Sequence, residues 1–340
     1  MSKILVLGYF GYDTNQKDGQ TIKTRNIYDL LKSKGLNLSF YDTQHSRKNP
    51  LSIFSMIVKL MRCEKLVLIP CLNNLTYLFP VIFIFSVIFR FEIIHIGVGG
   101  WLDKYCKEYP LISKLLQRNK IILLENIDTV NSLKDNLKFN NVEYFHNYRI
   151  IDYVPIFTQK KAEEPLRIVF MARVNKKKGL DVIFSIADHY LINKSHSIII
   201  DFYGPIEPEH NDYFKENIAK YDFVQYKGIL NSDEINPILN NYDLMILPTR
   251  YYTEGFPGSI LDAYISGIPV LVSNWKHASE FVDDGVNGFI CNVDVVDEFI
   301  VVIEKLRSNN ELLLQMKHNA WKSSHKYSSE AAWDILKNQL

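Results

Sequence analysis

The feature that most constrains this chain is the alternation of short, apolar, β-branched segments with longer amphipathic segments. Such alternation is typical of a parallel β-sheet covered by helices. Some strand segments are apolar almost throughout, as in residues 65–70 (KLVLIP), which indicates burial on both faces of the sheet. The first series predicts strands at Ile4–Leu7, Leu36–Tyr41, Leu66–Ile69, Ile93–Ile96 and Ile121–Leu124.

A second series of the same kind follows the polar, charged stretch Thr158–Pro165. It predicts strands at Arg167–Met171, Ser197–Tyr203, Val224–Lys227, Leu244–Leu247, Val270–Ser273 and Phe289–Cys291. A length of 340 residues fits two domains. We therefore predict an α/β protein with two tandem Rossmann-like domains, residues 1–155 and 156–322, that face each other across a cleft. The predicted helix at 323–340 packs back on the first domain. Ligands of such sheets bind at the carboxyl ends of the strands.

Composition and the first residues bear on the cellular compartment. The four cysteines form no C-x-x-C pair, which indicates buried thiols in a reducing compartment, neither a disulfide framework nor a zinc site. The opening MSKILVLGYFGYD has the pattern of a first strand running into a loop, because Gly, Tyr and Asp interrupt its apolar run. We therefore expect a cytoplasmic protein.

Charge is distributed unequally along the chain. The net charge is only +1, which argues against nucleic acid as a partner. Residues 1–150 carry 20 Lys and Arg against 12 Asp and Glu, a net charge of +8, whereas residues 151–340 carry 19 against 26, a net charge of −7. Two interpretations remain open: a first domain that contacts an anionic membrane surface on the cytoplasmic side, or scattered surface charge.

The longest apolar run, Leu78–Phe89 (LFPVIFIFSVIF), is too short to span a bilayer, which takes about 20 residues. Pro80 lies near its start, a position that helices favour. The run is predicted to form a helix buried between layers, and a segment that enters a lipid interface is the alternative.

The richest motif lies in Tyr242–Asn292, where an apolar strand leads into a polar loop. Glu254 precedes Gly255, Phe256, Pro257 and Gly258, and a helix is expected to begin at Ser259. Glycines before a helix start present free backbone N–H groups and the positive end of the helix dipole, both of which suit a phosphate. Asp262, one turn into the helix, is placed to face the same ligand. Ile260 lies between Ser259 and Asp262. An ordinary strand–loop–helix with solvated carboxylates is the alternative.

This region resembles the donor-binding signature of retaining glycosyltransferases of family 4: Glu, then Gly-Phe-x-Gly, then a second acidic residue eight positions after the first. Here that second residue is Asp262, where the family usually has Glu. The resemblance implies that Glu254 contacts the hydroxyls of the donor sugar and that Asp262 contacts the ribose of the nucleotide. Residues 267–270 (GIPV) and the later Glu280 also resemble the family.

A second element is Ile168–Gly179, in which Arg173 follows a predicted strand and Lys178 precedes a glycine at a helix start. Two cations flanking such a loop can neutralise a diphosphate leaving group. The alternative is that Lys176, Lys177 and Lys178 are a solvated run. The resemblance favours the first interpretation, because the family uses Arg and Lys at this spacing on the donor phosphates.

The resemblance implies further candidates in weaker motifs. Gly204, after the strand IIIDFY, corresponds to a strand end that lines the nucleotide base. Gly19, in the loop 11–19, corresponds to a glycine facing the donor phosphates, although Gln20 replaces the usual second glycine. An ordinary loop is the alternative there.

The segment 97–101 (GVGGW) provides acceptor-side candidates. Gly99 and Gly100 allow close approach of the backbone, and Asp103 is a candidate for contact with acceptor hydroxyls. Many family members carry a His at the end of this strand. His95 lies inside the strand, so a core position is the stronger interpretation and a site position the weaker.

Together these patterns predict a glycosyltransferase that moves a sugar from a nucleotide-diphosphate donor, with UDP preferred, to a saccharide or lipid-linked saccharide. The sequence contains no D-x-D triplet, and we expect the cations and the helix start to act without a metal ion or other cofactor. Two alternatives are retained: a nucleotide-sugar 2-epimerase and a non-catalytic binding scaffold. Dinucleotide binding is not supported, because no G-x-G-x-x-G follows the first strand.

Overall fold

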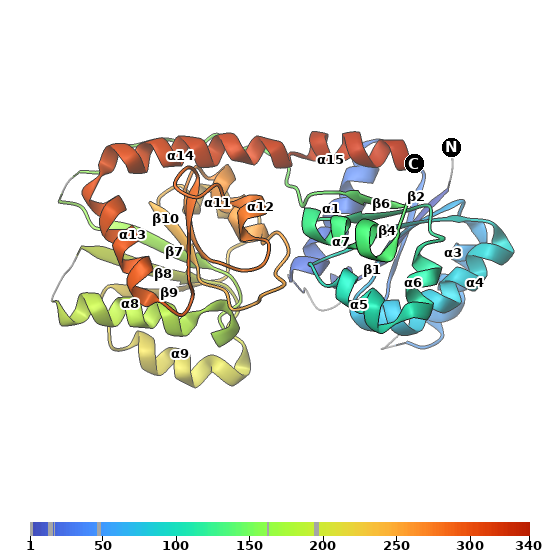
Figure 1. Ribbon diagram of the computed structural model, residues 1–340, viewed down its shortest axis with the longest axis horizontal. Helices are drawn as coiled ribbons and strands as arrows, with labels where there is room; N and C mark the ends of the chain where they lie inside the picture. The colour runs from blue at the N-terminus through green and yellow to red at the C-terminus, as the bar shows by residue number, and fades with distance from the viewer. Residues whose placement is uncertain (1–2, 13–15, 17, 46–48, 162, 194–196) are drawn as a thin grey trace. The chain divides into compact units, whose positions relative to one another are not determined.

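The computed structural model describes residues 3–12, 16, 18–45, 49–161, 163–193 and 197–340. The chain divides into two units (Figure 1). Unit 1 consists of Met1–Tyr148 and Ser329–Leu340, and unit 2 of Arg149–Ser328. These limits lie several residues from the predicted domain limits of 155/156 and 322/323.

Unit 1 is a parallel sheet whose described strands follow the order β2-β1-β3-β4-β5-β6. Its strands are β1 (Ile4–Gly8), β2 (Leu38–Asp42), β3 (Lys65–Ile69), β4 (Glu92–Ile96), β5 (Ile121–Leu124) and β6 (Val142–Tyr144). Its helices are α1 (Gly19–Ser33), α3 (Ser52–Arg62), the π-helix η2 (Asn74–Leu78), α4 (Phe79–Phe89), α5 (Leu102–Glu108), α6 (Pro110–Leu116), α7 (Ile127–Leu137), α15 (Ser329–Leu336) and the 3-10 helix η6 (Lys337–Gln339).

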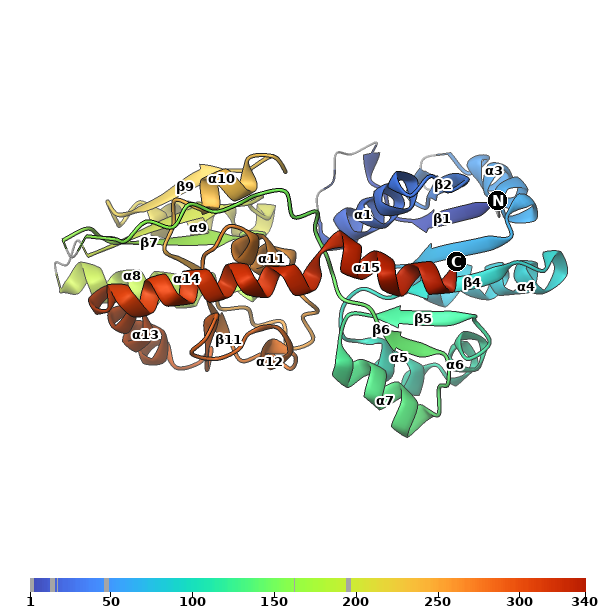
Figure 2. The same ribbon diagram turned by 90° about the horizontal axis from the view of Figure 1, so that it is seen from above.

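The helices of unit 1 cover both faces of its sheet. Because the strand order turns between β1 and β3, right-handed crossovers place the helices before and after that point on opposite faces. Ile27 and Leu31 of α1 share one core cluster with Ala332 and Leu336 of α15. Helices α3, α4, α5, α6 and α7 pack in the second cluster on the other face (Figure 2). The C-terminal helix is therefore part of the core of unit 1.

The apolar run 78–89 is helical, but it is not buried between layers as predicted. Phe79, Ile82 and Phe83 of α4 are buried, whereas Ile84 and Val87 lie on an exposed side of the same helix. The physical reason is geometric: one face of α4 packs on the sheet, and no further described layer covers the other. None of the described helices combines the length and the apolar composition needed to cross a membrane.

Unit 2 is a parallel sheet in the order β12-β11-β10-β7-β8-β9 over its described strands, the order of a Rossmann fold. Its strands are β7 (Leu166–Met171), β8 (Ile198–Tyr203), β9 (Val224–Gly228), β10 (Leu244–Leu247), β11 (Val270–Ser273) and β12 (Gly288–Cys291). Its α-helices are α8 (Leu180–Ile192), α9 (Asn211–Ile218), α10 (Ile235–Leu239), α11 (Gly258–Ile265), α12 (Ala278–Phe281), α13 (Val296–Ser308) and α14 (Asn310–Ser324). Its 3-10 helices are η3 (Lys176–Lys178), η4 (Pro208–His210) and η5 (His325–Tyr327).

The predicted class, two parallel α/β sheets, is confirmed, and each predicted strand corresponds to an observed one within one or two residues. Two short elements were missed. Strand β6 (VEY) is too short for an alternation to be recognised, and no helix was predicted for the segment that forms α5. Strand β6 is the edge strand of its sheet, next to β5.

Candidate active site

The two motif loops of unit 2 leave adjacent strands at the same edge of the sheet. Strand β7 leads into the loop of Arg173 and Lys178, and β10 leads into the loop of Glu254. Strands β7 and β10 pair in parallel, so both loops begin at the carboxyl edge. This is also where the strand order turns, the position at which such sheets bind ligands.

The backbones of these two loops are in direct contact. Gly179 has φ 84°, and a Cβ added there would lie 2.0 Å from the carbonyl oxygen of Pro248. The N–H of Arg250 donates to the carbonyl of Lys177 at 2.8 Å. Any other residue at position 179 is strained, because its side chain would meet backbone that must shift to make room. The second loop therefore holds Lys178 in place.

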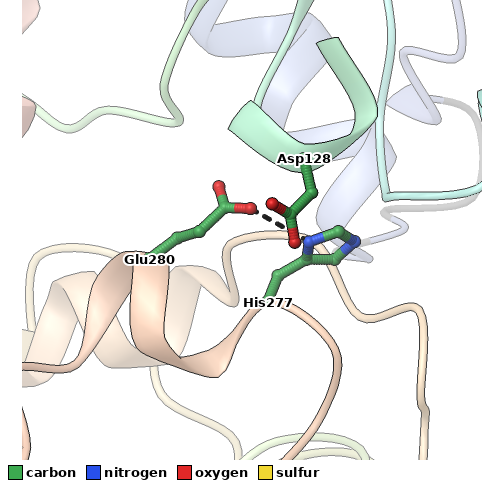
Figure 3. Close-up of side chains that lie close together, drawn as sticks. All are labelled: Asp128, His277 and Glu280. Atoms are coloured by element: carbon green, nitrogen blue, oxygen red, sulfur yellow. Dashed lines mark hydrogen bonds and ion pairs between the residues drawn. The ribbon is translucent and has the colours of Figure 1, made fainter. Parts of the chain in front are cut away.

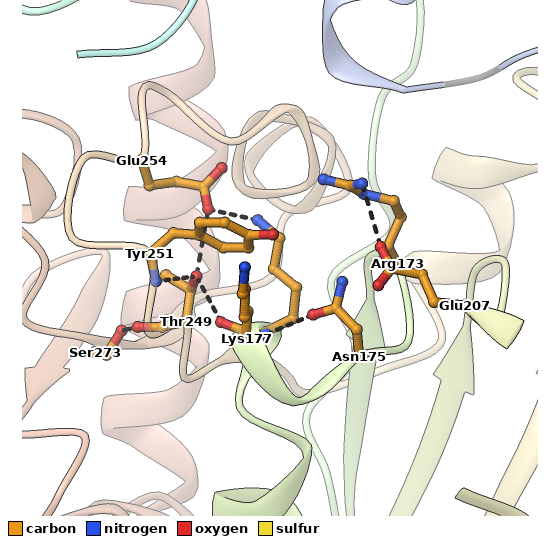
Figure 4. Close-up of polar contacts among 9 residues, drawn as sticks. Arg173, Asn175, Lys177, Glu207, Thr249, Tyr251, Glu254 and Ser273 are labelled. Atoms are coloured by element: carbon orange, nitrogen blue, oxygen red, sulfur yellow. Dashed lines mark hydrogen bonds and ion pairs between the residues drawn. The ribbon is translucent and has the colours of Figure 1, made fainter. Parts of the chain in front are cut away.

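Lys178 and Glu254, both predicted as catalytic, form an ion pair between Nζ and Oε2. Figure 4 shows Glu254 with its neighbours Thr249 and Tyr251. Thr249 also donates to Glu254 Oε2 from its hydroxyl at 3.3 Å, and Nζ lies 4.9 Å from the ring centre of Tyr251. Asn175 accepts from the backbone N–H of Lys178 at 2.9 Å. Lys178 is buried, so its charge acts with less screening than a surface charge.

Arg173 leaves the same loop but is held differently. Its Nη1 lies 3.2 Å from Glu207 Oε1, and its side chain is about half exposed (Figure 4). An exposed ion pair of this kind contributes little to stability. Arg173 can therefore leave Glu207 for a phosphate at small cost.

The start of α11 provides backbone donors, as the glycine motif predicted. Pro257 is its N-cap residue and no side chain caps it, and Gly258 and Ser259 are only partly buried. The N–H of Ile260 already donates to the carbonyl of Pro257 at 3.1 Å, so the donors that remain for a ligand are those of Gly258 and Ser259. Gly255 is buried beside them.

Two side chains of this motif belong to the core. Phe256 stacks on Phe281, with ring centres 4.2 Å apart, and contacts Tyr327. Ile260 is fully buried. Both side chains point inward, Phe256 from the loop before α11 and Ile260 from the helix itself, so only their backbone atoms can face a ligand.

Asp262 has a partner that sequence reasoning missed. Arg149 Nε lies 2.8 Å from Asp262 Oδ1, and Nη2 lies 3.4 Å from Oδ2. The guanidinium also covers the start of α11, since a Cβ added to Gly258 would lie 2.4 Å from Arg149 Nη2. Arg149 thus places a cation at the helix start. No local pattern could have revealed it, because it is 113 residues from Asp262.

Gly204 directly follows β8 and has a conformation that favours glycine. Its φ is 129°, and an added Cβ would lie 1.9 Å from the carbonyl oxygen of Ala172. The hydroxyl of Tyr226 donates to the Gly204 carbonyl at 3.0 Å. Gly204 therefore allows β8 to pass close to the Arg173 loop.

A further polar pair lies at the start of α12. His277 Nδ1 and Glu280 Oε1 are 3.0 Å apart, and His277 is completely buried (Figure 3). Glu280 belongs to the part of the motif region that resembles family 4. A separate group in unit 2, Glu207, Glu209 and His210, offers ligand atoms within 4.8 Å of one another, but Glu207 already pairs with Arg173.

In unit 1, part of the predicted loop 11–19 lies outside the described residues. Gly19 is the first residue of α1, and Asp18 accepts from the N–H groups of Gln20 and Thr21 at 3.0 and 3.1 Å. A carboxylate thus occupies the helix start where the prediction placed a phosphate, and an added Cβ at Gly19 would meet open space. The contacts of the described residues around Gly19 therefore do not indicate a phosphate site there.

The loop 97–101 is fixed by a buried ion pair. Lys23 Nζ lies 2.6 Å from Glu125 Oε2 and donates to the carbonyl of Gly97 at 3.1 Å. Glu125 Oε1 accepts from the N–H of Gly99 at 2.7 Å. Gly99 has φ 83°, as expected for a glycine that allows an unusual turn, and Gly100 is buried next to it.

The two remaining candidates of unit 1 are both buried. Asp103 is 9% exposed in the first turn of α5, where the helix dipole favours a carboxylate. His95 is 1% exposed within β4 and packs edge-on against Phe79. The core interpretation of His95 is therefore confirmed, and its inclusion among acceptor contacts is wrong because it does not reach the surface.

Burial lowers the pKa of His95 from 6.5 to about 4. Among the described residues, no polar atom lies within hydrogen-bonding distance of its Nδ1. Because the unfolded chain takes up this proton more readily, the stabilising effect of neutral His95 is complete above pH 6.5 and is lost as pH falls toward 4. In urea titrations between pH 7 and 4 we expect His95→Met to remove a pH-dependent loss of about 3 kcal/mol. An unchanged pH dependence in the variant would contradict this.

The site lies in a segment that is similar to known proteins. Residues 156–323, which include Lys178, Glu254 and Asp262, match the model of the family described as glycosyl transferases group 1. Glycogen synthase of Pseudomonas syringae pv. tomato is 26% identical over 200 residues, which are 56% of this chain and 40% of that protein. The capsular polysaccharide biosynthesis glycosyltransferase CapM of Staphylococcus aureus is 26% identical over 180 residues, 50% of this chain and 44% of CapM. The chain thus matches less than half the length of these relatives.

Comparison with solved structures identifies the fold. The structure is similar to that of Anabaena HepE in complex with UDP and glucose, with a TM-score of 0.75 over 99% of both chains at 15% identity. Together with the two Rossmann-like sheets, this likeness defines a two-domain GT-B fold.

Proposed function

We propose that the protein is a glycosyltransferase of capsular or exopolysaccharide synthesis that uses a nucleotide-diphosphate sugar. The observation that carries the proposal is the contact between Lys178 and Glu254 beside the start of α11. It joins a cation, a carboxylate and backbone donors at the carboxyl edge of unit 2. The match of residues 156–323 to glycosyl transferases group 1 supports the reaction class, and CapM supports the biosynthetic context. The epimerase alternative receives no support from these relatives.

In the proposed reaction, the bond between the anomeric carbon and the phosphate oxygen breaks, and the nucleoside diphosphate leaves. The acceptor hydroxyl oxygen forms the new bond on the same face of the sugar, and its proton passes to the departing phosphate. Lys178, Arg173 and the N–H groups of Gly258 and Ser259 stabilise the developing charge. Glu254 accepts hydrogen bonds from hydroxyls of the donor sugar. We propose that these cations make a metal ion unnecessary.

Substrate assignments complete the proposal. UDP is the proposed nucleotide, since HepE, with the same fold, was crystallised with UDP and glucose. We place the acceptor, a saccharide or lipid-linked saccharide, in unit 1, where Lys23 and Glu125 fix the loop of Gly99. The proposed location is the cytoplasmic side of the plasma membrane, where such acceptors are available.

The function is tested by turnover of a panel of UDP-, GDP- and ADP-sugars with saccharide and lipid-linked acceptors. We expect transfer from a UDP-sugar, with unchanged rate in EDTA, and a product in which NMR shows the anomeric configuration of the donor. An inverted product would contradict the retaining mechanism. Transfer from GDP-sugars alone would contradict the choice of base, and loss of activity in EDTA would contradict metal independence.

A non-catalytic scaffold is the second candidate, and one observation favours it: Arg149 already engages the Asp262 carboxylate proposed to bind the ribose. Titration calorimetry with UDP, followed by the turnover panel, separates the two functions. UDP binding with no turnover of any donor would establish the scaffold; turnover would exclude it.

A further inference from the structure

Helices α3 and α4 of unit 1 contact each other (Figure 1). Both helices present apolar side chains to solvent. We define the α3–α4 surface by the exposed residues Ile53, Phe54, Val58, Met61, Val81, Ile84, Val87 and Ile88. The opposite faces of both helices pack in the core of unit 1. A helix that is apolar on all sides normally lies buried, so this exposed face indicates a partner.

The chemistry of α4 shows what kind of partner fits. From Phe79 to Phe89 the helix has one polar side chain, Ser86, whose hydroxyl donates to the carbonyl of Phe83 at 2.6 Å. The exposed face of α4 therefore offers no side-chain hydrogen bond. Protein interfaces carry about one hydrogen bond per 100–200 Å², whereas the hydrocarbon of a bilayer requires none.

Charge around the surface favours an anionic partner. Neither Ser52–Arg62 nor Asn74–Phe89 contains an acidic residue. Arg62 ends α3, and Arg90 follows α4; both are exposed. Crossover helices of a parallel sheet run in one direction, so these two arginines lie toward the same edge. Glu64 and Glu92 are exposed at this edge as well, but Glu92 pairs with Lys65 and Lys120. The two carboxylates are outnumbered by the cations Lys3, Lys59, Arg62, Lys65, Arg90 and Lys120. The edge is therefore a cationic border beside an apolar face, the pattern of a surface that binds anionic lipids.

A hollow lies at this border. It has a volume of about 490 Å³, and its walls combine apolar Phe54 and Val58 with the cations Lys3, Lys59 and Arg62. A phospholipid presents the same combination, an anionic phosphate next to acyl chains. The lining of the hollow is therefore chemically suited to a phospholipid headgroup and the adjoining part of its acyl chains.

From this arrangement we infer that the α3–α4 surface docks on an anionic phospholipid bilayer. Val87 and Ile88 enter the acyl boundary, and Arg62 and Arg90 contact headgroup phosphates. Docking of this kind places the two helices along the membrane surface, and neither helix crosses the bilayer. The inference does not depend on sugar transfer, since none of its residues belongs to the donor site of unit 2.

The test is co-sedimentation of the full chain with vesicles of phosphatidylcholine, with or without phosphatidylglycerol. We expect binding to the anionic vesicles at low salt. The pair Val87→Glu with Ile88→Glu should lower the partition coefficient by about tenfold or more, because charge on the inserted face opposes insertion. The pair Arg62→Gln with Arg90→Asn should lower it by about tenfold, and about 1 M salt should do the same to the wild type.

The matched control is Val301→Glu with Ile192→Glu in unit 2, residues that are 66% and 77% exposed against 65% and 63% for Val87 and Ile88. Near-wild-type vesicle binding of this pair is expected. An equal loss in the control, or absence of wild-type binding to anionic vesicles at low salt, would overturn the inference. So would sedimentation showing that Val87→Glu with Ile88→Glu only splits a dimer. UDP binding, measured in every variant, reports on the donor site separately.

Discussion

Replacing Lys178 with alanine should lower kcat for sugar transfer by about a hundredfold to a thousandfold, the usual cost of losing one group that stabilises developing charge. Lys178 is buried against Glu254 and Tyr251, so its ammonium is fixed before any donor arrives. A fixed charge stabilises the leaving diphosphate without reorganisation, so kcat should fall more than KM rises. Steady-state kinetics with the best donor of the panel measures both.

Lys177→Ala is the matched control, because it removes the same charge from the adjacent position. Lys177 is exposed, and its Nζ lies 5.7 Å from the ring centre of Tyr251 without an ion pair to Glu254. We expect its kcat to stay within about threefold of wild type, as for a screened surface charge. Equal losses in both variants would show that only the total charge matters. Near-wild-type activity of Lys178→Ala would remove Lys178 from the mechanism.

The second large effect is structural: Gly179→Ala should destabilise unit 2 by about 3 kcal/mol or more. Part of this loss comes from φ 84°, which costs an L-residue about 1–2 kcal/mol. The rest comes from the Pro248 carbonyl oxygen, which would lie 2.0 Å from the new Cβ. Urea denaturation monitored by fluorescence measures the change. Because Lys178 precedes Gly179, UDP affinity should fall as well.

Gly285→Ala separates the two causes. Gly285 has a similar φ of 75°, but a Cβ there would have no described atom within 4 Å. Its expected cost is the backbone contribution alone, about 1–2 kcal/mol, with unchanged UDP affinity. If the two alanine variants lose the same stability, the contact between the Gly179 and Pro248 segments has no energetic importance.

The sequence predicted the fold well because buried parallel strands are apolar almost throughout. Val270–Ser273 and Ile121–Leu124 were located to the residue for this reason. The donor region was likewise predictable as a loop that leads into a helix, since glycines before a helix start form a local pattern. Both signals depend on residues that are close in sequence.

Pairings between distant residues could not be predicted. Arg149 and Asp262 are 113 positions apart, and Lys23 and Glu125 are 102 apart, so no spacing connects them. The direction in which the side chains of the motif point could not be predicted either. Phe256 was assigned to the ligand, yet it is buried against Phe281, because the loop geometry before α11 decides which way it points.

The position of α15 has a consequence for synthesis of the protein. Ala332 and Leu336 complete the core of unit 1, although all of unit 2 lies between them and the rest of unit 1 in the sequence. The first part of unit 1 is therefore made first but cannot finish folding until α15 has been synthesised, whereas every residue of unit 2 is available earlier. This reverses the usual order, in which the leading domain matures while the rest is still being translated. Chaperones would thus meet an incomplete first unit on every nascent chain.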